Sequence, residues 1–239
     1  MDMSPEKQED RDQAAAQEES GTATRPLREH SYYPVLYMFA VTFFFSAIVI
    51  GIAKATQARV TANKKVMFEK ALLEATLPGH FGDGIRVNEA HELFLKHAKL
   101  PKESSGGAYR ILAEGKLVAY GLPFEGQGYW DVVKGVIGLS VDGSEVIGVC
   151  FYQQKETPGL GGEIVKPAFR GQFRGLRLGP GEKPLAIVPG GTATREWEVE
   201  AVTGATQTCS RVERIINDAL RQWRRRKNGE RESLEEPEA

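Results

Sequence analysis

The clearest indication of the fold is EAVTGATQTCSRVERII, which runs from Glu200 to Ile216. Its first residues continue a β-like segment and its last residues begin a strongly helical pattern, so it predicts a strand, a turn and a helix. Four hydroxyl side chains lie in and around the turn, at Thr203, Thr206, Thr208 and Ser210. Because one hydroxyl is enough to cap a helix, the others need a different explanation.

One explanation is a binding site at the helix N-terminus. The first backbone N–H groups of a helix lack partners within it, and the helix dipole places partial positive charge there, so this end favours a phosphate. Gly204 allows backbone conformations that other residues avoid and lets a bulky ligand come close. The other explanation is an ordinary helix cap, with Thr208 or Ser210 as the N-cap residue. These residues alone leave both explanations open.

The segments around this stretch combine a helix with several strands. Before it, from Ala108 onwards, short apolar runs alternate with glycine, and Asp142-Gly143 predicts a hairpin between two β-rich segments. Further strands are predicted at Lys183–Pro189 and Trp197–Val202. After it, apolar residues recur on one face of a predicted helix: Val212, Ile215, Ile216, Ala219, Leu220 and Trp223.

Two more helices are predicted before the strands. Residues 56–79 look helical, and Pro78-Gly79 is a stop signal. Their apolar face consists of Phe68, Ala71, Leu72 and Ala75. A shorter helix is expected at about Asn88–Ala98. Helices grouped around β-rich segments predict a single α+β domain, which we expect to span residues 55–225.

An uncharged run precedes this domain. From Pro34 to Ala53 the sequence reads PVLYMFAVTFFFSAIVIGIA, and roughly twenty apolar residues span the ~30 Å hydrocarbon core of a bilayer as a helix. We expect a transmembrane helix at residues 32–54, after a disordered tail at residues 1–31, and a charged C-terminal tail at residues 226–239. The alternative is a cleaved signal peptide, but the run is long and follows a long acidic segment.

The charge balance and the few cysteines exclude several classes of protein. With 31 basic and 32 acidic side chains, the chain lacks the basic excess of nucleic-acid binders, so no nucleic acid is expected as a partner. Cys150 and Cys209 are too few for a disulfide framework; they either pair with each other or remain free thiols. Four histidines show no ligand spacing, so no metal site is expected.

A second motif, KETPGLGGE, occupies Lys155–Glu163 and directly follows a β-like segment. Pro158 stiffens this loop, whereas its three glycines allow conformations closed to other residues. Such a loop suits a surface shaped to a flat ligand, with Glu156 and Thr157 offering hydrogen bonds. Taken alone, the motif is better explained as an ordinary tight turn after a strand.

Together the two motifs resemble a known family. The sequence Glu-Thr-Pro-Gly-Leu-Gly at Glu156–Gly161, followed by Thr-Gly-Ala-Thr at Thr203–Thr206, is similar to the FMN-binding domain of two related respiratory complexes. The proteins are the C subunit of the sodium-translocating NADH:quinone oxidoreductase (Nqr) and the G subunit of the Rnf ferredoxin:NAD oxidoreductase. The resemblance covers roughly residues 33–222 and includes one membrane helix and a glycine-aromatic segment, here Gly126–Trp130.

This resemblance implies a covalently bound FMN. The last threonine of the family's [Ser/Thr]-Gly-Ala-Thr motif, here Thr206, would form a phosphoester with FMN, made by a flavin transferase that uses FAD and Mg²⁺. Thr203 and Gly204 would shape the acceptor turn, together with Ala205. No side chain is expected to act as an acid, base or nucleophile during turnover. The remaining cofactor-binding residues would be Glu156, Thr157, Leu160, Gly161 and Tyr129.

Some features depart from the family pattern. Glu200 stands where the transferase motif usually begins with Asp, which keeps the charge but extends its reach. Gln154 stands where many Rnf proteins of the family have histidine, and Gly161–Glu163 resembles the Nqr protein more closely. The family places the flavin domain outside the cytoplasmic membrane, whereas lysine and arginine are more frequent just after the membrane helix, which alone favours a cytoplasmic domain. We follow the family topology, because the transferase acts outside.

The sequence therefore predicts a membrane-anchored flavoprotein subunit of an Nqr- or Rnf-type redox-driven ion pump, in the inner membrane with its flavin domain on the periplasmic side. Expected partners are the other pump subunits, the membrane, and the flavin transferase during maturation. The alternatives are a flavinylated carrier of another extracytoplasmic redox chain and a non-redox anchor or assembly protein of the same fold. A hydrolase is poorly supported, because the sequence has no Gly-x-Ser-x-Gly elbow.

Overall fold

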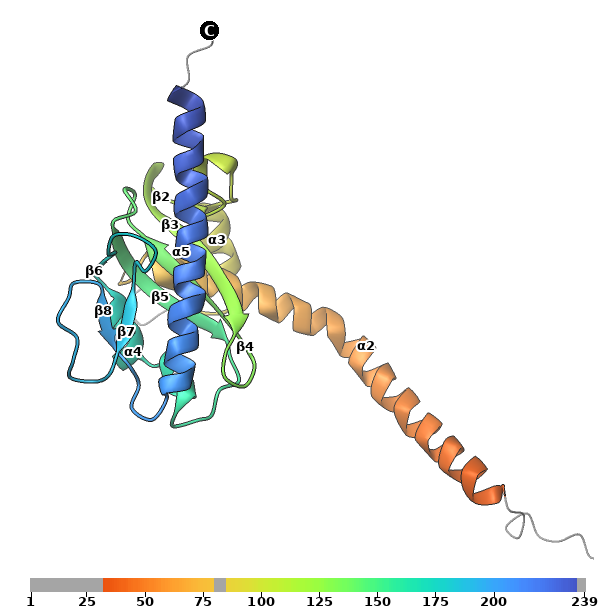
Figure 1. The fold of residues 1–239 in the computed structure, drawn as a ribbon. Helices are drawn as coiled ribbons and strands as arrows, with labels where there is room; N and C mark the ends of the chain where they lie inside the picture. The colour runs from red at the N-terminus through yellow and green to blue at the C-terminus, as the bar shows by residue number, and fades with distance from the viewer. Residues whose placement is uncertain (1–31, 80–84, 236–239) are drawn as a thin grey trace, which may run out of the picture. The chain divides into compact units, whose positions relative to one another are not determined.

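The structure is a computed structural model that describes residues 32–79 and 85–235 (Figure 1). The chain divides into two compact units, Met1–Arg59 and Val60–Ala239. Helix α2 (Tyr33–Thr76) includes residues of both. The tail predicted at residues 1–31 lies outside the described residues, as does the end of the tail predicted at residues 226–239.

Helix α2 joins the predicted membrane segment and the helix predicted at residues 56–79 into one element. Between Gly51 and Pro78 the sequence holds no glycine or proline, so nothing in it ends the helix after the apolar run. In the first unit α2 exposes large apolar side chains, among them Phe39 and Phe43. By length and composition, the helix is able to cross a membrane.

The second unit is built on a six-stranded antiparallel sheet in which each strand pairs with the next along the chain. The six strands are β1 (Ala98–Lys99), β2 (Tyr109–Ala113), β3 (Lys116–Gln127), β4 (Val132–Leu139), β5 (Glu145–Gln153) and β6 (Leu176–Arg177). A separate parallel pair, β7 (Ala186–Val188) and β8 (Glu198–Glu200), accounts for the last two predicted strands, although each is shorter than predicted.

Helix α5 (Thr206–Glu235) packs across one face of this sheet (Figure 1). The apolar stripe predicted from its sequence is buried there against Leu122 and Phe124 of β3 and Ile137 of β4. The helix continues past residue 225, where the charged tail was predicted to begin. The shorter helices are α3 (Ala90–His97), α4 (Pro167–Arg170), and the 3₁₀ helices η3 (Glu103–Ser105), η4 (Gly161–Val165) and η5 (Gly171–Phe173).

The last turns of α2, which belong to the second unit, pack against the opposite face over a row of glycines. Gly121, Gly138 and Gly148 are register partners on β3, β4 and β5. A Cβ on Gly138 would lie 2.2 Å from the carbonyl oxygen of Ala75, and one on Gly121 would lie 2.3 Å from Cδ1 of Leu72. The row therefore lets α2 approach the sheet more closely than side chains would allow.

The two cysteines lie on opposite faces of the sheet. Cys150 belongs to the apolar cluster beneath α2, and Cys209 belongs to the cluster beneath α5. Both are buried free thiols, so they do not pair with each other as a disulfide, which the sequence had left open. Burial raises the pKa of Cys150 to about 12 and also raises the pKa of Cys209, so both thiols are held in the neutral form.

Two hairpins show how turn chemistry sets the sheet. The hairpin predicted at Asp142-Gly143 is confirmed: it joins β4 to β5, and Gly143 has a φ of +78°. A second hairpin, between β2 and β3, was not predicted. Its two central residues, Glu114 and Gly115, have φ of +51° and +79°, as a type I′ turn requires. The sequence Glu-Gly lacks the asparagine or aspartate that usually marks this turn.

Gly138→Ala is expected to lower the free energy of unfolding of the second unit by about 1–3 kcal/mol, because its Cβ would overlap backbone atoms of α2. Urea unfolding of the full chain in detergent, followed by tryptophan fluorescence, measures the change. Gly171→Ala is the matched control: a Cβ there meets nothing within 4 Å, and its φ of −62° is ordinary, so stability should not fall. Equal losses would contradict the close approach.

The Asp142 carboxyl is expected to titrate far below its ordinary range. The hydroxyls of Ser140 and Ser144 donate to it over 2.5 and 2.6 Å and lower its pKa to about 2. Its stabilising effect is therefore present above the unfolded-state pKa of about 3.9 and is lost as the pH falls through 2. Asp142→Asn should flatten the pH dependence of unfolding between these values. A carboxyl midpoint near 4 by NMR would contradict this.

Candidate functional site

Both sequence motifs fold into tight turns of the same kind. The first turn, Thr157–Leu160, is closed by a 3.1 Å hydrogen bond from the last N–H to the first carbonyl. Its central residues are Pro158 and Gly159, and the φ of +77° at the glycine is the type II pattern. The second turn, Val202–Ala205, is closed by a 3.0 Å bond of the same type and has Gly204 at φ +77°.

Helix α5 begins directly after the second turn, at Thr206. Its first i to i−4 hydrogen bond runs from the N–H of Cys209 to the carbonyl of Ala205, so the N–H groups of the first three helical residues precede the ladder. Thr208 and Ser210 lie inside the helix. The explanation that one of them is the N-cap residue is therefore wrong.

A buried carboxylate joins the motif segments to a hairpin. Glu156 is only 5% exposed, and its oxygens accept hydrogen bonds from the Thr208 hydroxyl (2.7 Å) and the Trp130 N–H (3.1 Å). Its own N–H donates to the side-chain oxygen of Gln154 over 2.6 Å. A carboxylate is costly to bury unless it is hydrogen-bonded. These bonds therefore hold together the Glu156 loop, the β3–β4 hairpin and the first turn of α5.

An ion pair adds a second link between the loop and the hairpin. The ammonium of Lys155 lies 2.9 Å from a carboxylate oxygen of Asp131. This hydrogen bond lowers the pKa of Asp131 and raises the pKa of Lys155. The Lys155 side chain is solvent-exposed, so the pair contributes little to stability compared with the buried bonds of Glu156.

Glycines allow these segments to approach one another. A Cβ on Gly161 would lie 2.4 Å from the Thr208 hydroxyl oxygen, and one on Gly128 would lie 2.5 Å from a carboxylate oxygen of Glu156. A Cβ on Gly204 would lie 3.0 Å from Cδ2 of Leu160. The contacts across the site therefore need hydrogen atoms at these positions, which explains the glycine at each of them.

The two turns and the hairpin enclose a pocket of about 260 Å³. Every cofactor-binding residue predicted from the sequence lines it except Thr203, an exposed residue of the second turn. Three lining residues were not predicted: Trp130, Gln207 and Thr208. The full lining consists of Tyr129, Trp130, Glu156, Thr157, Leu160, Gly161, Gly204, Ala205, Thr206, Gln207 and Thr208.

The lining offers one part for a flat aromatic ring and one for a phosphate. Tyr129, Trp130 and Leu160 are 49%, 66% and 45% exposed, so apolar surface is open to a ligand. The first turn of α5 presents N–H groups and Thr206, an exposed residue with a hydroxyl. These residues fit FMN. Because the volume is below the roughly 300–1,000 Å³ of pockets that enclose a ligand, a bound FMN would stay partly exposed.

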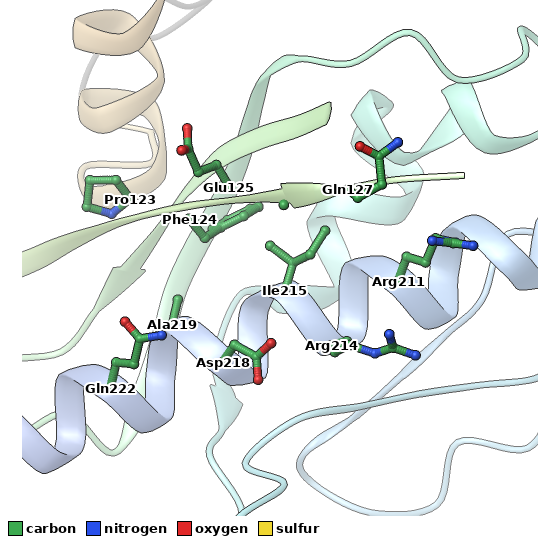
Figure 2. A pocket seen from close by; sticks show the side chains of 11 residues that line it. Pro123, Phe124, Glu125, Gln127, Arg211, Arg214, Ile215, Asp218, Ala219 and Gln222 are labelled. Carbon is green, nitrogen blue, oxygen red and sulfur yellow. The ribbon is translucent and has the colours of Figure 1, made fainter. Parts of the chain in front are cut away.

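A larger hollow of about 390 Å³ lies between β3 and α5 (Figure 2). Figure 2 shows Ile215 pointing from α5 towards β3, whereas Glu125 and Gln127 point to the other side of the strand. The hollow contains none of the predicted cofactor-binding residues. Arg211 lines this hollow, and its guanidinium lies 6.0 Å from the centre of the ring of Tyr129, which lines the pocket between the two turns. Arg211 is therefore close to both.

Glu200, which departs from the family motif, faces a neighbouring loop. Its carboxylate accepts a 2.9 Å hydrogen bond from the N–H of Gly191. Its backbone is fixed by the Gln172 side chain, which accepts from its N–H (2.7 Å) and donates to its carbonyl (3.2 Å). Glu200 does not line the pocket. In the described part of the chain, no three His, Cys, Asp or Glu side chains are grouped to hold a metal ion.

Comparison with known proteins gives a family for the region that contains the site. Residues 128–221 match the FMN-binding domain family. The chain is 37% identical over 102 residues to the C subunit of the Na(+)-translocating NADH-quinone reductase of Neisseria meningitidis serogroup A, covering 42% of this chain and 40% of that protein. It is 34% identical over 124 residues to the corresponding Vibrio vulnificus protein, covering 50% and 49%. The match thus spans less than half of each relative.

Solved structures share the fold. The C subunit of the Parabacteroides distasonis reductase aligns with a TM-score of 0.60 at 21% identity, covering 71% of this chain and 96% of that one. NqrC of Shewanella oneidensis aligns with a TM-score of 0.58 at 21% identity, covering 70% and 99%. The resemblance of the two motifs to the FMN-binding domain family is therefore confirmed for residues 128–221. The α+β fold after an apolar N-terminal helix is also confirmed.

Gly204→Ala is expected to destabilise the second unit by about 1–2 kcal/mol, because a side chain strains the left-handed backbone at φ +77° and would meet Leu160. Thermal or urea unfolding of the full chain measures the loss. Gly190→Ala is the control, since a Cβ there meets nothing within 4 Å and no positive φ is involved. An unchanged midpoint in Gly204→Ala would contradict the turn geometry.

Proposed function

We propose that this chain, whose residues 128–221 belong to the FMN-binding domain family, carries FMN covalently on Thr206 and relays electrons within an Nqr-type membrane complex. The observation that carries the proposal is the position of Thr206, an exposed residue in the first turn of α5 that lines the pocket between the two glycine turns. The names of the relatives favour an Nqr-type complex over an Rnf-type complex.

Thr206 would provide the attachment point. Its hydroxyl oxygen would bond to the phosphorus of the FMN moiety while a flavin transferase breaks the pyrophosphate bond of FAD, with AMP and the hydroxyl proton as the leaving products. The N–H groups and the dipole at the start of α5 would stabilise the phosphate charge. When bound, FMN supplies the electron transfer, and the protein supplies its position and environment.

The remaining lining residues would hold the ring. Tyr129, Trp130 and Leu160 would pack against its apolar surface, and the backbones of Gly161 and Gly204 would let it come close. Because the pocket is small and its rim exposed, one edge of the ring would remain at the protein surface. That exposure suits a carrier that exchanges electrons with neighbouring subunits and has no substrate of its own to convert.

The apolar part of α2 would anchor the chain in the inner membrane. We assign the anchor to residues 32–54 and the flavin domain to residues 55–225, on the periplasmic side where the flavin transferase would act. The length and composition of α2 support the anchor. The partners of the mature protein would be the other subunits of the complex.

Thr206→Ala is expected to abolish covalent flavin. The full chain would be co-expressed with a flavin transferase, separated under denaturing conditions and viewed for flavin fluorescence. Thr206→Ser, which keeps a hydroxyl, should retain fluorescence. Ser210→Ala is the matched control, since Ser210 is an exposed hydroxyl residue that lies outside both the Thr203–Thr206 motif and the pocket lining. A dark wild-type band would contradict the covalent link, and a bright Thr206→Ala band would contradict the site.

A further inference from the structure

Two threonines in the first turn of α5 have opposite surroundings. Thr206 is exposed, whereas Thr208 is only 3% exposed and donates its hydroxyl hydrogen to the buried Glu156 carboxylate. Residues two apart on a helix point about 200° apart, so one faces the pocket mouth and the other faces the interior. The first turn of α5 therefore offers two hydroxyls for two different tasks.

We propose that Thr208 is a positioning residue: it holds the Glu156–Gly162 loop against α5, so that the loop fixes the flavin ring, while Thr206 only attaches the phosphate. The inference rests on the proposed function. It divides the binding of one cofactor between two neighbouring hydroxyls. Attachment depends on the exposed one, and immobilisation of the ring depends on the buried one.

The hydrogen bonding of the loop supports this division. The backbone bonds that close the loop are internal, from Leu160 and Gly162 to the carbonyl of Thr157. Among the described residues, the bond from Thr208 to Glu156 is the one hydrogen bond found between this loop and the first turn of α5. The loop and α5 also pack closely at Gly161 and Gly204. Unlike a hydrogen bond, such packing contacts do not fix the orientation of the loop.

Two walls of the pocket belong to the segments that this bond joins, and the hairpin with Tyr129 and Trp130 supplies the third. Thr157, Leu160 and Gly161 line one of the two walls, and the residues from Gly204 to Thr208 line the other. Without the Thr208 hydroxyl, a buried carboxylate oxygen of Glu156 loses its donor. The loop then opens so that water can reach the oxygen, because a buried acceptor without a partner is costly. Thr206 is an exposed residue without this bond as well, so the attachment of its hydroxyl to the phosphate does not depend on the bond.

The test compares Thr208→Val, which keeps the size but loses the hydroxyl, with Thr208→Ser, which keeps the hydroxyl. Both full-length proteins would be co-expressed with the flavin transferase. Thr208→Val should keep the fluorescent band on a denaturing gel but lose flavin anisotropy in the native protein, with iodide quenching raised roughly twofold or more as the open loop becomes populated. Thr208→Ser should match the wild type. Wild-type anisotropy and quenching in a folded Thr208→Val protein would overturn the proposal.

A second variant covers the case in which Thr208→Val does not fold. Glu156→Ala removes this hydrogen bond from the other side, together with the bond from the Trp130 N–H, and should lower the anisotropy at least as much. In the double variant Thr208→Val should add nothing to the effect of Glu156→Ala, since the bond between the two residues is already lost. Unchanged anisotropy in Glu156→Ala, or fully additive effects, would overturn the proposal.

Hydrogen exchange separates this inference from the proposed function. Amide exchange of residues 156–162 needs no flavin and should be faster in Thr208→Val than in Thr208→Ser. A dark wild-type band together with faster exchange would remove the attachment at Thr206 but keep the role of Thr208 in holding the loop. A bright band with equal exchange in both variants would keep the attachment and overturn the role of Thr208.

Discussion

The buried carboxylate of Glu156 is the interaction on which the candidate site depends. Its oxygens accept hydrogen bonds from a side-chain hydroxyl and a backbone N–H, from two different segments. Since a carboxylate that loses these donors in a buried place is strongly destabilising, the segments must stay together for the fold to keep the site. The shape of the pocket follows from this requirement, and the glycines around the carboxylate are what make the close packing possible.

The scaffold beneath the site depends on a second close approach. The row of glycines across β3, β4 and β5 brings the last turns of α2 against the sheet, while α5 covers the other face. Residues 68–75, in the last turns of α2, are thus part of the core of the second unit. The end of α2 is therefore a layer of this unit, and the first turn of α5 can rest on a sheet that is covered on both faces.

Local patterns in the sequence predict the parts of the fold that depend on near neighbours. The stripe on α5 and the hairpin at Asp142-Gly143 follow from spacing and turn chemistry, and both are present. The pairing of Thr208 with Glu156 was not predicted, because the two residues are 52 positions apart and nothing in either motif names the other as its partner. Because its partner Glu156 cannot be recognised from the sequence, Thr208 is there a candidate helix cap, the usual role of a hydroxyl at the start of a helix.

The most direct measurement is mass spectrometry of the peptide that contains the second motif. Trypsin cleaves after Arg195 and Arg211, which releases a peptide that holds Thr203, Thr206, Thr208 and Ser210 together. From protein co-expressed with the flavin transferase, we expect a peptide that carries the added mass of esterified FMN, with fragment ions that assign it to Thr206. An unmodified peptide, or FMN on any of the other three hydroxyls, would contradict covalent attachment at Thr206.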